Sequence, residues 1–262
     1  MSEVHLSISI VSHGHAQHVQ RLLVDLARCA PPACEVLLTL NLPEQVDLPA
    51  QMPFALRIID NASPKGFAAN HNHAFSVSRG DYFVILNPDV RLSENPFPAL
   101  LTMLARTPQA IVAPLIVNDA GTVEDSARNF PTPLLLMKKA AGKLFRFNLA
   151  QDPVPARDEW LMPDWVAGMF MVLPRATYAA LGGLNEHYFL YYEDVDFCAR
   201  ARLAGCEILV NRNVRVVHQA QRDSHKKARY LLWHLKSAAK FFTSQAYLRI
   251  SWQRLRSNFQ GF

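Results

Sequence analysis

The sequence feature that most constrains the fold is an apolar run that ends abruptly in a turn. The run Tyr82–Leu86 is followed directly by Asn87, Pro88 and Asp89. Apolar, β-branched and aromatic residues bounded by a turn signal predict a buried strand, and proline cannot continue a central strand. Asp89 is therefore expected at the carboxyl end of a strand, where open α/β sheets bind ligands. A carboxylate there can coordinate Mg²⁺ or Mn²⁺ on a diphosphate, although a turn without chemistry has the same pattern.

Predicted strands and helices alternate through the first half of the chain. The strands cover residues 6–11, 34–40, 56–59 and 82–86, and the helices cover residues 16–28 and the stretch after Gly66. Such alternation predicts βαβ units and a mainly parallel sheet flanked by helices, in the α/β class. The layout is typical of nucleotide-binding domains, although a fold alone assigns no chemistry.

The second half continues the alternation with longer connections. Helices are predicted over 96–106, 175–181 and 194–204, and strands over 110–117, 164–173 and 209–217. Residues 151–163 contain three prolines and four charged residues, a composition that predicts a mobile loop.

Three acidic residues, Glu193, Asp194 and Asp196, follow an aromatic run and begin the predicted helix 194–204. Repulsion between clustered carboxylates is tolerated when a metal, an arginine or a helix N-terminus compensates it. The cluster is therefore either a functional site or a set of capping acids with an ion pair to Arg200.

Composition restricts the partners of the chain. A net charge of +5 and a pI near 9.1 favour an anionic partner. The four cysteines lack metal-ligand spacing and fit a reducing compartment. We predict neither a signal peptide nor a membrane span, and the basic residues lack a nucleic-acid-binding motif.

The C-terminal segment is strongly basic. After Asp223 there is no acidic residue, and lysines and arginines alternate with leucines and aromatic residues. A basic helix with an apolar face predicts binding to a membrane surface. Packing of the apolar side on the domain is the alternative, and both can hold for different segments.

Four sequence motifs together carry a family resemblance: ISIVSHGH, GFAANHNHAF, ILNPDV and FLYYEDVDFCARA. In this order they resemble family 2 glycosyltransferases of the GT-A type. The segment HQAQRDSHKKARYLLWHLKSAAKFF resembles bacterial rhamnosyltransferases of O-antigen and cell-wall polysaccharide assembly. The resemblance implies a GT-A domain over residues 1–222, with a nucleotide-binding half to about residue 117, and a basic helical extension over 223–262.

The resemblance also implies roles for individual residues. Asp89 and His218 would hold the metal, Asp194 would act as the catalytic base, and Glu193 would orient the acceptor. Residues expected near the donor nucleotide or sugar are Ser12, His13, Gly14, Asn41, Asp60, Gly66, Asn70, Asn72 and Asn87. Either Asn41 or Asp60 would bind the nucleobase, because the family's usual acidic residue at the end of strand two is replaced here by Asn41. Trp165 and Gly168 could line the acceptor site.

The expected activity is inverting, metal-dependent transfer of L-rhamnose from dTDP-L-rhamnose to a polyprenyl-diphosphate-linked sugar. The protein would lie at the cytoplasmic face of a bacterial membrane, bound peripherally through its basic C-terminal helix. The alternatives are another nucleotide-sugar donor with the same mechanism, or a non-catalytic scaffold that binds nucleotide or lipid.

Overall fold

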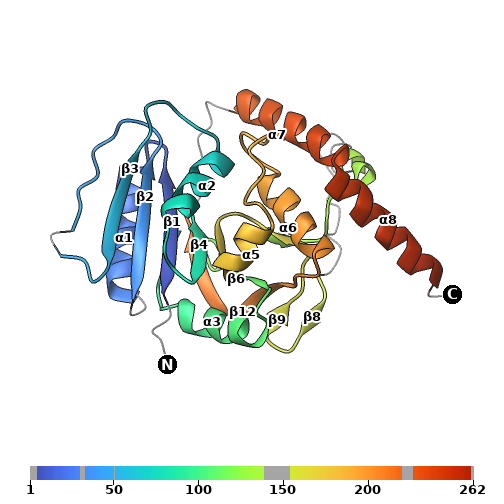
Figure 1. The fold of residues 1–262 in the computed structure, drawn as a ribbon, viewed down its shortest axis with the longest axis horizontal. Helices are drawn as coiled ribbons and strands as arrows, with labels where there is room; N and C mark the ends of the chain where they lie inside the picture. The colour runs from blue at the N-terminus through green and yellow to red at the C-terminus, as the bar shows by residue number, and fades with distance from the viewer. Residues whose placement is uncertain (1–4, 30–32, 50, 139–153, 220–226, 261–262) are drawn as a thin grey trace.

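The computed structural model describes residues 5–29, 33–49, 51–138, 154–219 and 227–260 of the 262-residue chain. Its main sheet has ten strands: nine follow the order β3-β2-β1-β4-β11-β6-β12-β9-β8, and the tenth, the short strand β5, pairs with β12. Helices cover both faces of this sheet (Figure 1). The architecture is the predicted α/β fold with a mostly parallel sheet.

The N-terminal half follows the predicted alternation closely. Its elements are β1 (Leu6–Ser12), α1 (Ala16–Cys29), β2 (Cys34–Leu40), β3 (Ala55–Asp60), α2 (Phe67–Val77) and β4 (Tyr82–Leu86). The four strands pair in parallel, with β1 between β2 and β4. Their carboxyl ends therefore lie along one edge of the sheet, as the alternation predicts.

One antiparallel strand interrupts the parallel arrangement. β11 (Phe170–Pro174) lies between β4 and β6 (Ile111–Val117) and runs opposite to both. β12 (Ile208–His218) then pairs in parallel with β6 and, through its last two residues, antiparallel with β5 (Val90–Arg91). The start of β11 thus meets the carboxyl end of β4.

Two expectations for this half are corrected. Residues 164–173 do not form one strand, because a turn at Ala167–Met169 separates β10 (Trp165–Val166) from β11, and β10 pairs with β7 (Ala127–Arg128) instead. The described part of 151–163 is not a plain loop but a hairpin of β8 (Ala156–Arg157) and β9 (Trp160–Leu161), and residues 151–153 lie outside the described residues. β9 pairs with β12, and this pairing buries Trp160.

The remaining helices are α3 (Phe97–Arg106), α5 (Arg175–Ala180), α6 (Glu193–Leu203), α7 (Lys227–Phe242) and α8 (Gln245–Gln260). Side chains alternate along the buried strands: Phe83 and Ile85 of β4 face one core, and Val84 and Leu86 face the other. The first core lies under α2, α5 and α6, and the second lies under α1 and α3.

The C-terminal helices complete the first of these two cores. Phe241 of α7 is fully buried and Ile250 of α8 nearly so, in the same cluster as Phe197 of α6. α7 and α8 run beside α6 along the outer side of the molecule (Figure 1). They are thus packed against the domain along their inner sides. Among the described residues, no helix has the length and apolar character needed to span a bilayer.

Candidate active site

Backbone pairing brings Asp89 and His218 together. His218 is in register with Val90, and the N–H of Gln219 donates to the carbonyl of Asp89 at 2.9 Å. The Nε2 atom of His218 consequently lies 3.3 Å from Oδ2 of Asp89, and its Nδ1 atom lies 2.7 Å from Oε2 of Glu124. The imidazole is therefore held between two carboxylates.

The donor set at this point fits a divalent cation that also binds phosphate oxygens. The Oδ1 atom of Asp89 is buried and has no hydrogen-bond partner among the described residues. Burial lowers the pKa of His218, but the hydrogen bonds and charges of Asp89 and Glu124 outweigh it and raise the pKa to about 9. A cation would take the place of the Nε2 proton. The described residues form no ready cluster of three or more ligands, so water and diphosphate oxygens would have to complete the coordination.

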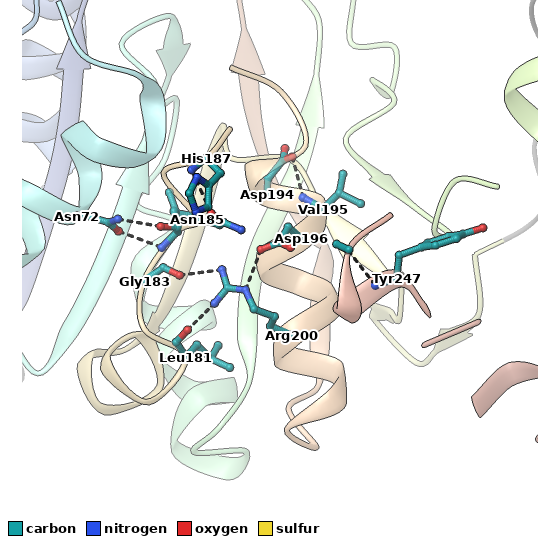
Figure 2. A network of polar contacts seen from close by, with 12 residues as sticks. Asn72, Leu181, Gly183, Asn185, His187, Asp194, Val195, Asp196, Arg200 and Tyr247 are labelled. Carbon is teal, nitrogen blue, oxygen red and sulfur yellow. Dashed lines mark hydrogen bonds and ion pairs between the residues drawn. The ribbon is translucent and has the colours of Figure 1, made fainter. Parts of the chain in front are cut away.

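A second acidic site lies at the start of α6. Asp194 accepts a hydrogen bond from the N–H of Gly168 at 3.1 Å. It also accepts one from the N–H of Val195 at 2.8 Å, which Figure 2 shows. Glu193 is buried, and its Oε2 atom has no partner among the described residues. The two neighbouring carboxyl groups therefore have different surroundings.

These surroundings favour different protonation states. Burial raises the pKa of Glu193 well above its ordinary value, and the charge of Asp194 adds to the rise. Burial also raises the pKa of Asp194, but the N–H groups of Gly168 and Val195 oppose that rise. Because hydrogen bonds to the charged form favour ionisation, Asp194 is the more readily ionised of the two, and Glu193 is the one that retains a proton to higher pH.

The turn at Gly168 and Met169 connects the two acidic sites. The carbonyl of Met169 accepts from the N–H of Asn87 at 2.8 Å, while the N–H of Gly168 donates to Asp194. A Cβ atom on Gly168 would lie 3.1 Å from the ring of Phe67, so a larger residue there would require that ring to shift. The Asn87–Asp89 turn and the Glu193–Asp194 pair thus flank one short segment.

Asp196 serves the fold, as the ion-pair interpretation predicts. Its carboxylate accepts from Nε of Arg200 at 2.8 Å, and the same guanidinium donates to the carbonyls of Leu181 and Gly183 (Figure 2). This network anchors the segment after α5 to α6. Asp196 is therefore held by a side-chain ion pair, whereas Asp194 is bonded to backbone N–H groups.

Asn41 and Asn70, expected near the donor, are engaged within the protein. The Oδ1 atom of Asn41 accepts from Lys65 N and Asn61 Nδ2, and its Nδ2 atom contacts Lys65 O and His13 Nδ1, all within 3.0 Å. Asn70 is 1% exposed and accepts from Asn61 at 2.6 Å. Their amides shape the loop between β3 and α2, which argues against direct binding of the nucleotide by either residue.

Asn72 and Gly66 also have structural roles. The Oδ1 atom of Asn72 accepts from Tyr178 Oη at 2.7 Å and Leu184 N at 2.9 Å, and its Nδ2 atom donates to Leu184 O and to Glu186. This amide joins α2 to the segment after α5 rather than facing a ligand. A Cβ atom on Gly66 would lie 2.8 Å from Phe189 O, so glycine is required there for a close backbone approach.

The other donor-side candidates lie at the carboxyl ends of the first strands. Ser12 is buried and accepts from His15 N at 3.2 Å at the start of α1, while Gly14 has a φ of +79° and donates its N–H to Glu44. His13 contacts Asn41, and Asp60 is exposed at the end of β3. Of the two candidates for the nucleobase, Asn41 is thus hydrogen-bonded within the protein and Asp60 is exposed.

Comparison with known proteins agrees with this arrangement. The model of the family described as Glycosyl transferase family 2 matches residues 38–156, which include the Asn87–Asp89 turn. The chain carries a family 2 glycosyltransferase domain. It is accordingly a glycosyltransferase, and the predicted family is confirmed.

Two relatives match this glycosyltransferase over most of its length. Rhamnosyltransferase WbbL of Escherichia coli is 24% identical over 251 residues, which cover 92% of this chain and 94% of the relative. The N-acetylglucosaminyl-diphospho-decaprenol L-rhamnosyltransferase of Mycobacterium tuberculosis is 26% identical over 266 residues. The match covers 92% of this chain and 84% of the relative. Both are named as rhamnosyltransferases.

Solved structures of larger glycosyltransferases share the fold. GalNAc-T7 with UDP, GalNAc and Mn²⁺ superposes with a TM-score of 0.60 at 14% identity, over 83% of this chain and 44% of the other. The mannosyltransferase PcManGT of Pyrobaculum calidifontis, with GDP-Man and Mn²⁺, superposes with a TM-score of 0.59 at 14% identity. This match covers 92% of this chain and 65% of the other. The chain spans less than two thirds of either structure, and the likeness shows the GT-A fold.

Three features of this glycosyltransferase site were not predicted from the sequence. They are the contact of Glu124 with His218, the N–H of Gly168 at Asp194, and the support of the loop before α6 by α7. Only Gly168 carried a sequence signal, as a glycine inside an apolar run.

Proposed function

We propose that this glycosyltransferase transfers L-rhamnose from dTDP-L-rhamnose to a sugar carried on a polyprenyl diphosphate, with inversion at the anomeric carbon. The observation that carries the proposal is the Gly168–Met169 turn, which hydrogen-bonds to the Asn87–Asp89 turn on one side and to Asp194 on the other. One short segment thus lies beside a candidate cation ligand and a candidate base. The names of both long relatives support rhamnose as the transferred sugar.

Asp89 and His218 would hold Mg²⁺ or Mn²⁺ against the diphosphate of the donor. A bound divalent cation supplies stabilisation of the charge that develops on the leaving diphosphate. Asp89 Oδ1, which is buried and has no hydrogen-bond partner in the described part of the chain, and His218 Nε2 suit this role. His13, Gly14 and Asp60 would surround the nucleoside at the carboxyl ends of the first three strands.

Asp194 would accept the proton of the attacking hydroxyl. The acceptor oxygen forms a bond to the anomeric carbon, the bond from that carbon to the diphosphate oxygen breaks, and the nucleoside diphosphate leaves with the electron pair. The proton of the hydroxyl passes to Asp194, which the N–H groups of Gly168 and Val195 keep ionised. Glu193, which keeps its proton, would donate a hydrogen bond that orients the acceptor.

A different donor with the same mechanism is the second candidate. The two solved relatives hold UDP and GDP-Man, and the amide of Asn41, at the position expected to read the base, is already saturated. Base recognition then depends on the exposed Asp60 and its neighbours, which do not by themselves restrict the donor to thymidine nucleotides.

The outward faces of α7 and α8 support a membrane as the second partner. Leu231, Leu232 and Leu235 of α7 are each more than half exposed, as are Leu248 and Trp252 of α8. At 100° per residue, each set forms one stripe. The stripe of α8 lies opposite its buried residues Ala246 and Ile250, and the stripe of α7 lies beside its buried face. Exposed apolar stripes of this kind mark interaction sites.

The charges beside these stripes fit an anionic bilayer. Arg229 and Lys236 of α7 and Arg249 and Arg256 of α8 are exposed, and neither helix contains an acidic residue. Basic side chains flanking an exposed apolar stripe are typical of helices that lie in a membrane interface. Peripheral binding to the cytoplasmic face of a bacterial membrane would bring the site to a polyprenyl-linked acceptor.

A transfer assay with purified protein tests the reaction. The assay contains Mn²⁺ or Mg²⁺, a polyprenyl-diphosphate-GlcNAc acceptor and a panel of dTDP-, UDP- and GDP-sugars. We expect product with dTDP-L-rhamnose and loss of product with a chelator. Product with another sugar alone would replace the donor but keep the mechanism, and nucleotide binding without product from any donor would favour the scaffold alternative.

Vesicle cosedimentation tests the membrane surface. We expect the double variant Leu231→Gln and Leu235→Gln, and the single variant Trp252→Gln, to bind phosphatidylglycerol-containing vesicles less than the wild type. The control is Val24→Gln, which removes an equally exposed apolar side chain from α1, on the opposite side of the molecule. Equal binding of all variants would exclude this surface.

A further inference from the structure

We propose that Glu124 is a positioning residue of the cation site, which holds the imidazole of His218 with Nδ1 as the donor and Nε2 facing the cation. The inference rests on the proposed use of Asp89 and His218 as cation ligands. It assigns a role to a side chain that belongs to none of the sequence motifs, 94 residues before its partner.

The backbone around Glu124 is fixed by the end of β6. A tight turn follows β6, with the N–H of Asn118 donating to Thr122 O and the N–H of Gly121 donating to Asn118 O. Val123 then bridges to Val117, and the N–H of Glu124 donates to Ile116 O at 2.9 Å. The carboxylate is therefore presented from a hairpin anchored on the neighbour of β12.

His218 comes from the adjacent strand with the matching orientation. Its Nδ1 atom lies 2.7 Å from Oε2 of Glu124, while its Nε2 atom lies 3.3 Å from Oδ2 of Asp89. The side chains of both His218 and Glu124 are largely buried, at 12% and 22% exposed. The two carboxylates thus contact different nitrogen atoms on opposite sides of the imidazole ring, so they can have different roles.

The chemistry of imidazole ligands explains the arrangement. A histidine ligand commonly donates its second N–H to a carboxylate, which fixes the tautomer and ring orientation and makes the ligating nitrogen more basic. Because Glu124 contacts Nδ1, a cation beside Asp89 is left with Nε2. Glu124 lies on the far edge of the ring and would not itself be a ligand of that cation.

A purely structural role of Glu124 predicts a different result. If Glu124 only forms an ion pair with a charged His218, its removal lowers the melting temperature and leaves cation binding unchanged. A positioning role changes cation affinity and the imidazole–cation contact. These two observables separate the readings without any assay of transfer.

The experiment is a titration of the full chain with Mn²⁺ in the presence of dTDP or UDP, and electron paramagnetic resonance measures the bound Mn²⁺. We expect Glu124→Ala to weaken Mn²⁺ binding roughly 10- to 100-fold, and Glu124→Gln, which can still accept a hydrogen bond, to weaken it less. The ¹⁴N coupling of bound Mn²⁺ to imidazole should weaken in parallel. Asp119→Asn is the matched control, because its carboxylate lies in the same hairpin and contacts Gln219 instead of His218.

Each outcome assigns the failure to one proposal. Tight Mn²⁺ binding by wild type, lost in Asp89→Asn but unchanged in both Glu124 variants, would overturn the role of Glu124 alone. If the wild-type protein fails to bind Mn²⁺ both with dTDP and with UDP, the cation site and this inference are overturned together. An equal loss in Asp119→Asn would attribute the effect to general charge and would also overturn it.

Discussion

The two sides of the site are held in place by different kinds of interaction. On the proposed cation side, Asp89, His218 and Glu124 are positioned by backbone pairing of β5 with β12 and of the hairpin after β6. On the proposed acceptor side, Glu193 and Asp194 follow a loop that is supported by side chains of α7. The first arrangement is set by sheet register, and the second depends on a helix far along the chain.

The acceptor side also contains backbone strain. Tyr191 and Tyr192, directly before the acidic pair, both have φ of +69°, a conformation that costs about 1–2 kcal/mol for a residue with a Cβ atom. Such residues persist where the surroundings over-determine them. Here Ser237 of α7 donates to Leu190 O at 2.9 Å, and Lys240 donates to His187 O at 2.6 Å.

Aromatic contacts add to this support. Trp233 packs on Phe189 with ring centroids 5.1 Å apart, and His234 lies against both Tyr191 and Tyr192. The inner face of α7 thus holds the loop, while its outer face is the proposed membrane surface. Perturbing each side of the site should have separable effects.

The largest effect is expected from Asp194→Asn. Loss of the base should lower kcat about 10²- to 10⁴-fold, while affinity for the nucleotide stays near wild type because the cation side is untouched. Kinetics with calorimetry of nucleotide binding measure both quantities. Glu94→Gln, an exposed change near α3, is the control, and a variant with near-normal turnover would remove Asp194 as the base.

Asp89→Asn should act on the opposite side. We expect Mn²⁺ affinity in the presence of nucleotide to fall at least tenfold, since an amide is a poorer ligand than a carboxylate. The melting temperature should change little, because the β5–β12 backbone pairing remains. Unchanged Mn²⁺ affinity, measured by paramagnetic resonance, would contradict the assignment.

Ser237→Ala should have a smaller effect, confined to the acceptor side. Loss of one hydrogen bond of about 1 kcal/mol corresponds to a roughly fivefold change in an equilibrium. We expect KM for the acceptor to rise by about that factor, with Mn²⁺ and nucleotide affinities unchanged. A matched rise in both donor and acceptor KM would show that α7 supports the whole domain rather than this loop.

The smallest effect is a pH-dependent change of stability in Glu193→Gln. The folded protein raises the pKa of Glu193, so wild-type stability is full below the unfolded pKa of about 4.3 and decreases as the pH rises toward the folded pKa. A glutamine side chain does not ionise, so the variant does not lose stability in this way as the pH rises. The melting temperature of the variant relative to wild type should therefore increase by a few degrees between mildly acidic and neutral pH, and a constant difference would contradict the protonated assignment.

The sequence predicted the elements better than it predicted the contacts. The apolar run before Asn87 and the alternation around it were enough for the parallel strands, because they depend on local pattern. The saturation of Asn41 and Asn72 could not be predicted, since their partners come from distant segments and an asparagine has the same sequence signal in a binding site as in a structural network.

The same limit explains Glu124 and the division of residues 164–173. Glu124 lies in a polar turn without periodicity, and only the pairing of β6 with β12 brings it to His218. The apolar run at 164–173 predicts one strand, but Gly168 turns the chain so that Asp194 gains a backbone donor. Long-range strand register, which the local sequence pattern does not encode, determines both the Glu124–His218 contact and the division of residues 164–173.

The reversed direction of β11 has a consequence for how such a domain can diversify. β6 ends at Val117 and β11 begins at Phe170, and because these strands are antiparallel, both points lie at the same edge of the sheet. The chain between them leaves and re-enters at one place. Its described residues add β8 and β9 only at the far end of the main sheet, so its length and composition can change while the order from β3 to β12 is kept, and it can act as an exchangeable cassette. We expect exchange of residues 125–167 between relatives, which leaves Glu124 and Gly168 in place, to alter which acceptor is chosen while the donor side stays constant.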